Sequence, residues 1–248
     1  MLQIATTIQE RGKRRESRNA LLFFIRDERS EAQLKPLPAK AVGGGPQAYR
    51  RLNQLLLSRL RGLQRKGIDV IVVSASHSSP TETLPLIVQR GESFGERITN
   101  GAADAFQLGY QNVVIVGNDC PDISPNDVSR AIDLLKGGTS YVGGPTKDGG
   151  AFLVGLRHDS NSTLFRELSW QTPRLFSELT SLPNAQTLDI TREDFDSWLA
   201  PEALRALTKL FRFALRCAGA HTYSQQHELT RTRRKALTRS FLSSPPLF

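Results

Sequence analysis

The sequence is short of cysteine and has no long apolar run, and each shortage narrows what the protein can be. Only two cysteines occur in 248 residues, too few for a disulfide framework, so we expect a protein of the reducing cytoplasm. No apolar run reaches the roughly 18 residues of a membrane-spanning helix. The first residues also lack an apolar segment followed by a cleavage site of small residues, so we expect no secretory signal.

Metal and hydrolase motifs are missing as well. The sequence has four histidines, and none stands at a zinc-ligand spacing from another histidine or from a cysteine. No Gly-x-Ser-x-Gly, Walker A or dinucleotide-binding motif is present, which argues against the enzymes that carry them. Cys120 has no histidine nearby in the sequence, and we expect it to be a small buried thiol rather than a nucleophile.

Positive charge is concentrated at the two ends of the chain. Of the net charge of +9, residues 1–18 contribute +3 and residues 204–248 contribute +8, whereas the stretch between them carries −2. A nucleic-acid-binding domain would carry its charge on a folded face. We therefore interpret the ends as solvated basic segments and expect no nucleic-acid partner. Docking of the C-terminal tail on anionic lipid or nucleic acid is the alternative.

Apolar runs typical of buried strands alternate with helical patterns between about residue 20 and about residue 195. The clearest strand covers residues 112–117, and the clearest helix follows Ser124, where Pro125 and Asp127 complete a capping pattern. We expect further strands over 20–25, 68–74, 84–89, 141–144, 151–156 and 186–190, and further helices over 46–66, 95–108, 163–169 and 173–180. This alternation predicts an α/β protein with three layers and a mainly parallel central sheet.

The same patterns predict how the chain is divided. We expect a basic N-terminal segment over residues 1–18, the α/β domain over 19–200, an amphipathic helix over 201–218 and a basic, poorly ordered tail over 219–248. Within the domain, the polar stretch 26–46 is rich in glycine and proline and is interpreted as a loop.

Asp119 is the first candidate for chemistry because it follows the clearest strand directly. In open α/β sheets, ligands bind beyond the carboxyl ends of the strands. A carboxylate at that edge can hold a divalent cation such as Mg²⁺, which prefers oxygen ligands and shares them with substrate phosphates. The pattern alone leaves open whether Asp119 only caps a turn, and whether Asp122 only favours the start of the next helix.

Two glycine-containing segments are further candidates. Gly149 and Gly150 follow Asp148 in a turn between two predicted strands, where glycine lets a ligand approach the backbone closely. Gly95 and Arg97 stand at the start of a predicted helix, where a guanidinium and backbone N–H groups can meet a phosphate. A plain turn and a helix start with an exposed ion pair are the alternatives.

Four motifs in this order resemble the DUF2064 family over about residues 20–195. They are Gly95-Glu-Arg, the run from Val113 to Ile123, the run from Gly144 to Leu156, and Ser169-Trp-Gln-Thr-Pro. Members of that family are bacterial glycosyltransferase-like proteins with the GT-A, or nucleotide-diphospho-sugar transferase, fold, often described as rSAM/selenodomain-associated transferases. The resemblance implies a Rossmann-like nucleotide-binding sheet and transfer of a group from a nucleotide or nucleotide-sugar donor to a small-molecule acceptor.

The resemblance also implies roles for the acidic motifs. Asp119 matches the aspartate expected to hold the metal, Mg²⁺ or Mn²⁺, and through it the diphosphate of the donor. Asp148, with Gly149 and Gly150, matches a turn expected to face the sugar or the acceptor, where Asp148 would position the acceptor or act as a base.

Nucleotide and substrate residues are implied in the same way. Lys35 aligns with a family lysine that supplies charge to the phosphates, and Gly95 and Arg97 match an element near the nucleotide. Trp170 and Thr172 match a Trp-Ser-Thr element expected to contact substrate.

The sequence departs from the family at several of these motifs. The usual Pro-Gly-x-Val-Lys-Thr-Arg-Leu segment is replaced by residues 30–38, and Leu37 stands where the arginine is expected. Gln171 replaces the serine of the Trp-Ser-Thr element, Ala151 stands where an aromatic is common, and Asp189-Ile-Thr-Arg replaces Asp-Val-Asp-Thr. These changes remove at least one phosphate-binding charge, and restoring arginine at position 37 would test that loss.

The residues and the resemblance lead to a metal-dependent transferase that uses a nucleotide-activated donor, with glycosyl transfer as the first hypothesis. A nucleotidyltransferase of the same fold and a catalytically degenerate family member that serves as a binding protein are the alternatives. The sequence leaves open the base, the sugar, the acceptor and the oligomeric state.

Overall fold

The computed structural model describes residues 19–37, 45–77, 79–195 and 201–210. Contacts within the chain divide it into two units, Met1–Ala206 and Leu207–Phe248. Residues 201–210 are helical, in the first part of the predicted helix. The predicted N-terminal segment and C-terminal tail lie outside the described residues. In the described ranges, every helix is too short or too polar to cross a bilayer.

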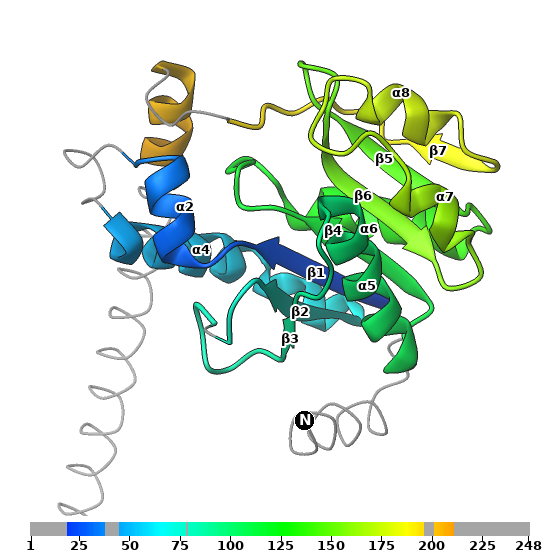
Figure 1. Cartoon of the computed structure of the whole chain (residues 1–248), viewed down its shortest axis with the longest axis horizontal. Helices are drawn as coiled ribbons and strands as arrows, with labels where there is room; N and C mark the ends of the chain where they lie inside the picture. The colour runs from blue at the N-terminus through cyan, green and yellow to red at the C-terminus, as the bar shows by residue number, and fades with distance from the viewer. Residues whose placement is uncertain (1–18, 38–44, 78, 196–200, 211–248) are drawn as a thin grey trace, which may run out of the picture. The chain divides into compact units, whose positions relative to one another are not determined.

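A seven-stranded sheet forms the centre of the first unit (Figure 1). Its strands are β1 (Asn19–Ile25), β2 (Ile68–Ser74), β3 (Leu86–Val88), β4 (Asn112–Val116), β5 (Tyr141–Pro145), β6 (Ala151–Arg157) and β7 (Ala185–Thr187). The spatial order is β3-β2-β1-β4-β6-β5-β7, and β6 alone runs antiparallel to its neighbours in this sheet. The predicted three-layer α/β fold with a mainly parallel sheet is confirmed.

Helices cover both faces of the sheet. They are α2 (Glu28–Leu34), α4 (Gly45–Leu60), the 3₁₀ helix η1 (Arg61–Lys66), α5 (Phe94–Gln107), α6 (Pro125–Lys136), α7 (Ser162–Arg166) and α8 (Leu175–Thr180). Because side chains alternate along a strand, Ala20, Leu22 and Phe24 of β1 pack in one core cluster with residues of α5, α7 and α8. On the other face, Leu135 of α6 packs beside Gly155 and Val114. Strands β1 and β4 are therefore buried on both faces of the sheet.

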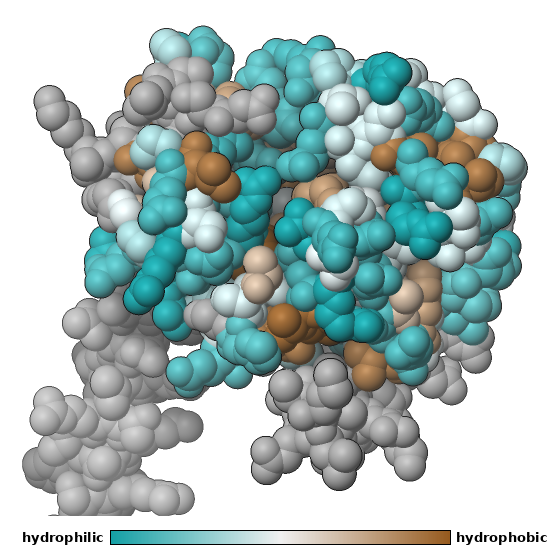
Figure 2. Space-filling view, viewed as in Figure 1, coloured by the Kyte–Doolittle hydropathy of each residue, from teal (hydrophilic) through white to brown (hydrophobic). Residues whose placement is uncertain are grey.

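The face shown in Figure 2 is mainly hydrophilic, and its apolar colour is confined to small patches. Among the described residues, the large apolar side chains that are exposed are Leu34 and Leu164, at 68% and 37%. Isolated exposed leucines are ordinary on a protein surface. Among the described residues, most large apolar side chains are therefore buried.

The predicted loop over 26–46 is wrong for residues 28–34, which form α2. Asp27 caps this helix, because its carboxylate accepts hydrogen bonds from the N–H groups of Arg29 and Ser30 at 3.1 and 3.0 Å. The Tyr49 hydroxyl of α4 donates a hydrogen bond to the Lys35 carbonyl at the end of α2. A short polar helix is stable here because its last turn is bonded to a longer one.

The strand order creates a topological switch point between β1 and β4. Strands β1, β2 and β3 succeed one another in one direction, and the chain then crosses to the opposite side of β1 to form β4. The carboxyl ends of β1 and β4 are neighbours in the parallel ladder, and ligands of open α/β sheets bind in the crevice beyond such a pair. Strand β5 ends at the same edge of the sheet. Strand β6 begins there, because it runs antiparallel to β4 and β5.

Leu37→Arg is expected to destabilise the protein rather than to supply a phosphate-binding charge. The Leu37 side chain is only 6% exposed, so a guanidinium there would lie unpaired in an apolar environment, at a cost of about 3 kcal/mol or more. Chemical denaturation measures the free energy of unfolding. The control is Leu37→Met, which keeps volume and polarity and should cost less than about 1.5 kcal/mol. An arginine variant as stable as the methionine variant would contradict the expectation.

Candidate functional site

Asp119 lies at the switch point, three residues beyond β4. It is half-buried, and its carboxylate makes no hydrogen bond or ion pair with any residue in the described part of the chain. A Cβ atom placed on Gly117 would lie 2.8 Å from Asp119 Oδ1. The carboxylate therefore lies directly against the bare Cα of Gly117, and any larger residue there would displace it.

The loop that carries Asp119 is fixed from several sides. The Asn118 side chain donates a buried hydrogen bond of 3.0 Å to Asn53 on α4, and the Arg59 guanidinium donates to the Pro121 carbonyl. The Asp119 carbonyl accepts a hydrogen bond from the Phe195 N–H at 3.1 Å. An ordered loop of this kind holds a ligand-binding carboxylate in place before the ligand arrives.

Cys120, the residue after Asp119, is buried and is not a candidate nucleophile. Its side chain is 1% exposed. Burial raises the pKa of the thiol far above its ordinary value, and the nearby negative charge of Asp119 raises it further. The thiol is therefore protonated and inaccessible, in agreement with its expected role as a small buried residue.

A buried ion pair fastens the segment after β7 to the same edge. Arg192 donates two hydrogen bonds of 2.9 Å to Asp127, whose side chain is 3% exposed. Asp127 also accepts from the Ser124 N–H at the start of α6, completing the predicted capping box. The Arg192 guanidinium lies 5.9 Å from the centre of the Phe152 ring, so the cation is held from two sides.

Glu31 is the carboxylate that the sequence analysis missed. It lies on α2, is 7% exposed, and has Arg26 Nη1 at 3.7 Å from its Oε2. Burial raises the pKa of Glu31, and the charges of Asp119 and Asp27 raise it further, against the lowering effect of Arg26 and Lys35. This coupling places Glu31 within electrostatic reach of Asp119. The signal in the sequence was Asp27, a capping residue two positions after the end of β1.

Lys35 belongs to the same neighbourhood. It ends α2, and its ammonium group is among the positive charges that act on Glu31. Glu31 therefore has a lysine within electrostatic reach, and the role that the resemblance implies for Lys35 at the phosphates stays a prediction. Leu37, two residues on, is in the core instead.

The residues of the Gly-Glu-Arg element have three different environments. A Cβ on Gly95 would lie 2.2 Å from the Arg166 carbonyl oxygen and 2.9 Å from Trp170 Cδ1, so this glycine allows close packing. The Glu96 carboxylate accepts from the Glu92 and Ser93 N–H groups at 2.8 and 3.3 Å and caps α5. It makes no ion pair with Arg97, so the exposed pair considered from the sequence is not formed.

Arg97 is the most unusual member of this element. Its Nε atom is buried without a hydrogen-bond partner, and the guanidinium forms no ion pair with a residue of the described ranges. A half-buried positive charge without a counterion costs free energy. A bound anion would remove that cost, which makes Arg97 a candidate phosphate ligand.

Asp148 shapes its own turn. Its carboxylate accepts a hydrogen bond of 2.5 Å from the Thr146 hydroxyl and one of 3.1 Å from the Gly150 N–H. Burial acts to raise the pKa of Asp148, but these hydrogen bonds outweigh it and hold the pKa below its usual value. A carboxylate with a lowered pKa is a weak base, so the geometry favours a structural role in the turn over proton abstraction.

The segment Ser169–Pro173 connects the separate motifs. Trp170 packs on Gly95, and its Nε1 donates to the Phe165 carbonyl at 3.1 Å. Gly149 has φ of +92°, and a Cβ there would lie 2.3 Å from the Pro173 carbonyl oxygen. Thr172 uses its hydroxyl to donate to the Ser169 carbonyl at 2.8 Å. Trp170, Thr172 and Gly149 thus have packing roles within the protein.

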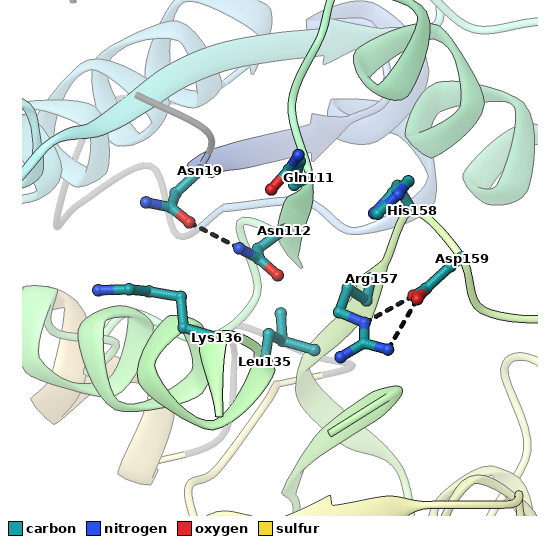
Figure 3. Close-up of a pocket in the computed structure, with 8 residues that line it drawn as sticks. All are labelled: Asn19, Gln111, Asn112, Leu135, Lys136, Arg157, His158 and Asp159. Carbon is teal, nitrogen blue, oxygen red and sulfur yellow. Dashed lines mark hydrogen bonds and ion pairs between the residues drawn. The ribbon is translucent and has the colours of Figure 1, made fainter. Parts of the chain in front are cut away.

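A pocket of about 610 Å³ lies elsewhere, at the opposite edge of the sheet (Figure 3). Its walls come from the start of β1 and β4, the end of α6 and the residues after β6. Four of its polar side chains pair with one another, since Asn112 donates to Asn19 at 2.9 Å and Arg157 donates twice to Asp159. No predicted site residue lines this pocket.

The described part of the chain supplies too few oxygen atoms at the switch point to hold a divalent cation alone, so phosphate oxygens of a bound substrate would have to complete its coordination. In the described ranges, no group of three or more His, Cys, Asp or Glu side chains is arranged to hold a metal ion. Toward the described residues, the Asp119 carboxylate makes no hydrogen bond, and neither does the buried Oε1 atom of Glu28 on α2. Oxygen donors of this kind suit Mg²⁺ or Mn²⁺, and substrate phosphates ordinarily complete the coordination of Mg²⁺.

Gly95→Ala is expected to destabilise the protein by about 1–3 kcal/mol, because the added methyl group overlaps the Arg166 carbonyl and the Trp170 ring. Urea denaturation followed by tryptophan fluorescence measures the loss. The matched control is Gly62→Ala in η1, where the nearest atom to the new Cβ is 3.8 Å away. If both alanine variants are equally stable, the contact with Trp170 is not a packing constraint.

Glu178→Gln is expected to lower stability at neutral pH and to have little effect in acid. Hydrogen bonds from the Ser169 N–H and hydroxyl, at 2.6 and 2.7 Å, lower the pKa of Glu178. A lowered pKa in the folded state contributes stability above the ordinary glutamate pKa, and this contribution is lost as the pH falls through the lowered value.

Urea midpoints for both proteins at pH 7 and at decreasing acid pH measure this difference. The gap between wild type and Glu178→Gln should close as the pH falls. A gap that stays constant would show that the glutamine acts through packing and not through charge.

The comparisons with known proteins agree with this geometry. The family described as "Uncharacterized protein conserved in bacteria (DUF2064)" matches residues 66–172. A proposed nucleotide-diphospho-sugar transferase from Desulfovibrio desulfuricans G20 is 23% identical, with 79% of this chain and 94% of that chain covered and a TM-score of 0.61. A homologue of Mycobacterium tuberculosis rv0371c from Mycobacterium sp. strain JC1 is 13% identical, with 79% and 98% covered and a TM-score of 0.52.

No curated protein matches the chain. The two solved structures share its fold, and the family match spans the candidate residues from Gly95 to Thr172. The family resemblance expected from the motifs is thereby confirmed: residues 66–172 match the model of the DUF2064 family, and the chain shares the fold of a structure described as a proposed nucleotide-diphospho-sugar transferase.

Proposed function

We propose that this protein is a metal-dependent transferase that takes a glycosyl group from a nucleotide-diphosphate donor. The observation that carries the proposal is Asp119, a carboxylate without a hydrogen bond or ion pair to any described residue, at the topological switch point of the sheet. The description of the Desulfovibrio structure as a proposed nucleotide-diphospho-sugar transferase supports the choice of donor.

Asp119 would hold Mg²⁺ or Mn²⁺, with Glu28 on α2 as a second source of oxygen. A bound divalent cation supplies charge that stabilises a diphosphate leaving group. Glu31 keeps the switch point acidic, because its buried carboxylate is electrostatically coupled to that of Asp119. The protein's contribution is to present these oxygens on a rigid loop and a capped helix.

Arg97 would bind the phosphates directly. Its half-buried guanidinium gains a counterion when a phosphate arrives, and Lys35 adds a second positive charge at the end of α2. In the reaction, an acceptor hydroxyl oxygen bonds to the anomeric carbon as the bond from that carbon to the diphosphate breaks. The nucleoside diphosphate leaves, and the hydroxyl proton passes to a base or to water.

Asp148, Gly149 and Gly150 would form the wall on the acceptor side. The internal hydrogen bonds of Asp148 hold the turn, and Gly149 lets the segment Ser169–Pro173 approach it closely. Positioning is the role proposed for this turn.

Calorimetric titration tests the proposal. A nucleoside diphosphate from a panel of UDP, GDP, CDP, ADP and dTDP should bind the full chain in the presence of Mn²⁺ and bind more weakly in EDTA. Asp119→Asn should weaken the metal-dependent binding at least about tenfold, which corresponds to about 1.4 kcal/mol. The matched control is Asp133→Asn on α6, an exposed aspartate at 73% that should bind as wild type does.

The outcomes separate the alternatives. Absence of binding by wild type to every nucleotide, or equal binding by Asp119→Asn, would contradict the proposal. Release of a nucleoside diphosphate from a nucleotide sugar supports glycosyl transfer. Release of pyrophosphate from a nucleoside triphosphate and a sugar phosphate would assign nucleotidyl transfer instead.

A further inference from the structure

Gln171 has a backbone conformation that its residue type does not favour. Its φ is +61°, and among the described residues the other non-glycine with positive φ is Asn184. Asparagine tolerates the left-handed region, whereas a longer side chain pays a steric cost there. Strain of this kind persists where the surrounding structure imposes it, often at functional sites.

The surroundings that impose this conformation are the two glycine contacts. On one side of Gln171, Trp170 is packed against Gly95, and on the other Pro173 is packed against Gly149. The Phe176 N–H also donates to the Gly149 carbonyl at 3.1 Å. The segment is therefore held between the start of α5 and the turn of Asp148, at the edge of the sheet that carries Asp119.

Within this segment, the other side chains are already engaged. The Ser169 hydroxyl donates to Glu178 at 2.7 Å, the Trp170 ring N–H donates to Phe165, and the Thr172 hydroxyl donates to Ser169. Gln171 is exposed, and its amide makes no hydrogen bond with a residue in the described ranges. It is the side chain of the segment that is available to a ligand.

We propose that Gln171 is a specificity-determining residue whose amide hydrogen-bonds hydroxyl groups of a carbohydrate in the site. The inference rests on the proposed function. An amide both donates and accepts, which matches hydroxyl groups, and it adds no charge beside the diphosphate. A site that hydrogen-bonds a substrate hydroxyl discriminates strongly against ligands that lack it. The carbohydrate is either the sugar of the donor or a sugar acceptor.

The test compares each nucleotide sugar with its own nucleoside diphosphate. Wild type, Gln171→Ala and the control Gln107→Ala, an exposed glutamine at the end of α5, are titrated with UDP and UDP-glucose, and with GDP and GDP-mannose, in Mn²⁺. Gln171→Ala should weaken the binding of the nucleotide sugar about fivefold and leave that of the diphosphate unchanged. The control should change neither.

Two further variants separate recognition from structure. Gln171→Gly removes both the amide and the steric cost, so it should keep or raise the melting temperature while losing the same sugar affinity. Gln171→Asn keeps an amide and tolerates the left-handed backbone, so it should restore part of the affinity. If both change the melting temperature without changing sugar binding, Gln171 has only a structural role and the inference is wrong.

The remaining outcomes are also decisive. An unchanged donor affinity with a raised KM for a sugar acceptor in Gln171→Ala assigns the amide to the acceptor. Unchanged donor affinity and unchanged acceptor KM, with normal binding of the diphosphate, overturn the inference and leave the proposed function standing. If wild type binds no nucleotide at all, the proposed function and the inference fall together.

Discussion

The candidate site depends on two places where the chain comes so close to itself that a methyl group would not fit. The Arg166 carbonyl and the Trp170 ring occupy the space beside Gly95, and the Pro173 carbonyl occupies the space beside Gly149. These contacts join a helix from the first half of the sheet to a turn from the second half. Three motifs that are far apart in the sequence become one rigid edge, and close packing makes that edge resistant to distortion.

The acidic groups are arranged by a different principle, the order of the strands. The loops that follow parallel strands lie at the same edge of the sheet. The residues after β1 and those after β4 therefore lie at the switch point. Asp119 arrives from β4, and Glu31 arrives on the helix that follows β1. Burial raises the pKa of Glu31, and the negative charge of Asp119 raises it further, as expected of carboxylates in a poorly solvated region.

The sequence predicted the sheet well because buried strands such as Asn112–Val116 have an unbroken apolar pattern, and it predicted α6 because Ser124, Pro125 and Asp127 are local signals. It did not predict α2, whose residues are polar and whose stability depends on contact with α4. Glu31 was missed for the same reason, since its burial follows from the position of that helix. A glycine required for packing and a glycine required by a ligand look alike in a sequence, so the close contacts of Gly95 and Gly149 had to be seen in three dimensions.

The charge balance at the switch point connects these observations to the proposed chemistry. The negative charges of Asp119 and Asp27 act on Glu31 there, and the positive charges that reach Glu31 are those of Arg26 and Lys35. Leu37, which stands where the resemblance implies an arginine, lies in the core. A diphosphate approaching such a region is repelled by its carboxylates, and this repulsion is strongest where water is excluded. A divalent cation reverses the sign of the local field. For the anionic donor that we propose, dependence on a metal ion is therefore the expected consequence of an acidic region in which position 37 is a buried leucine and not an arginine.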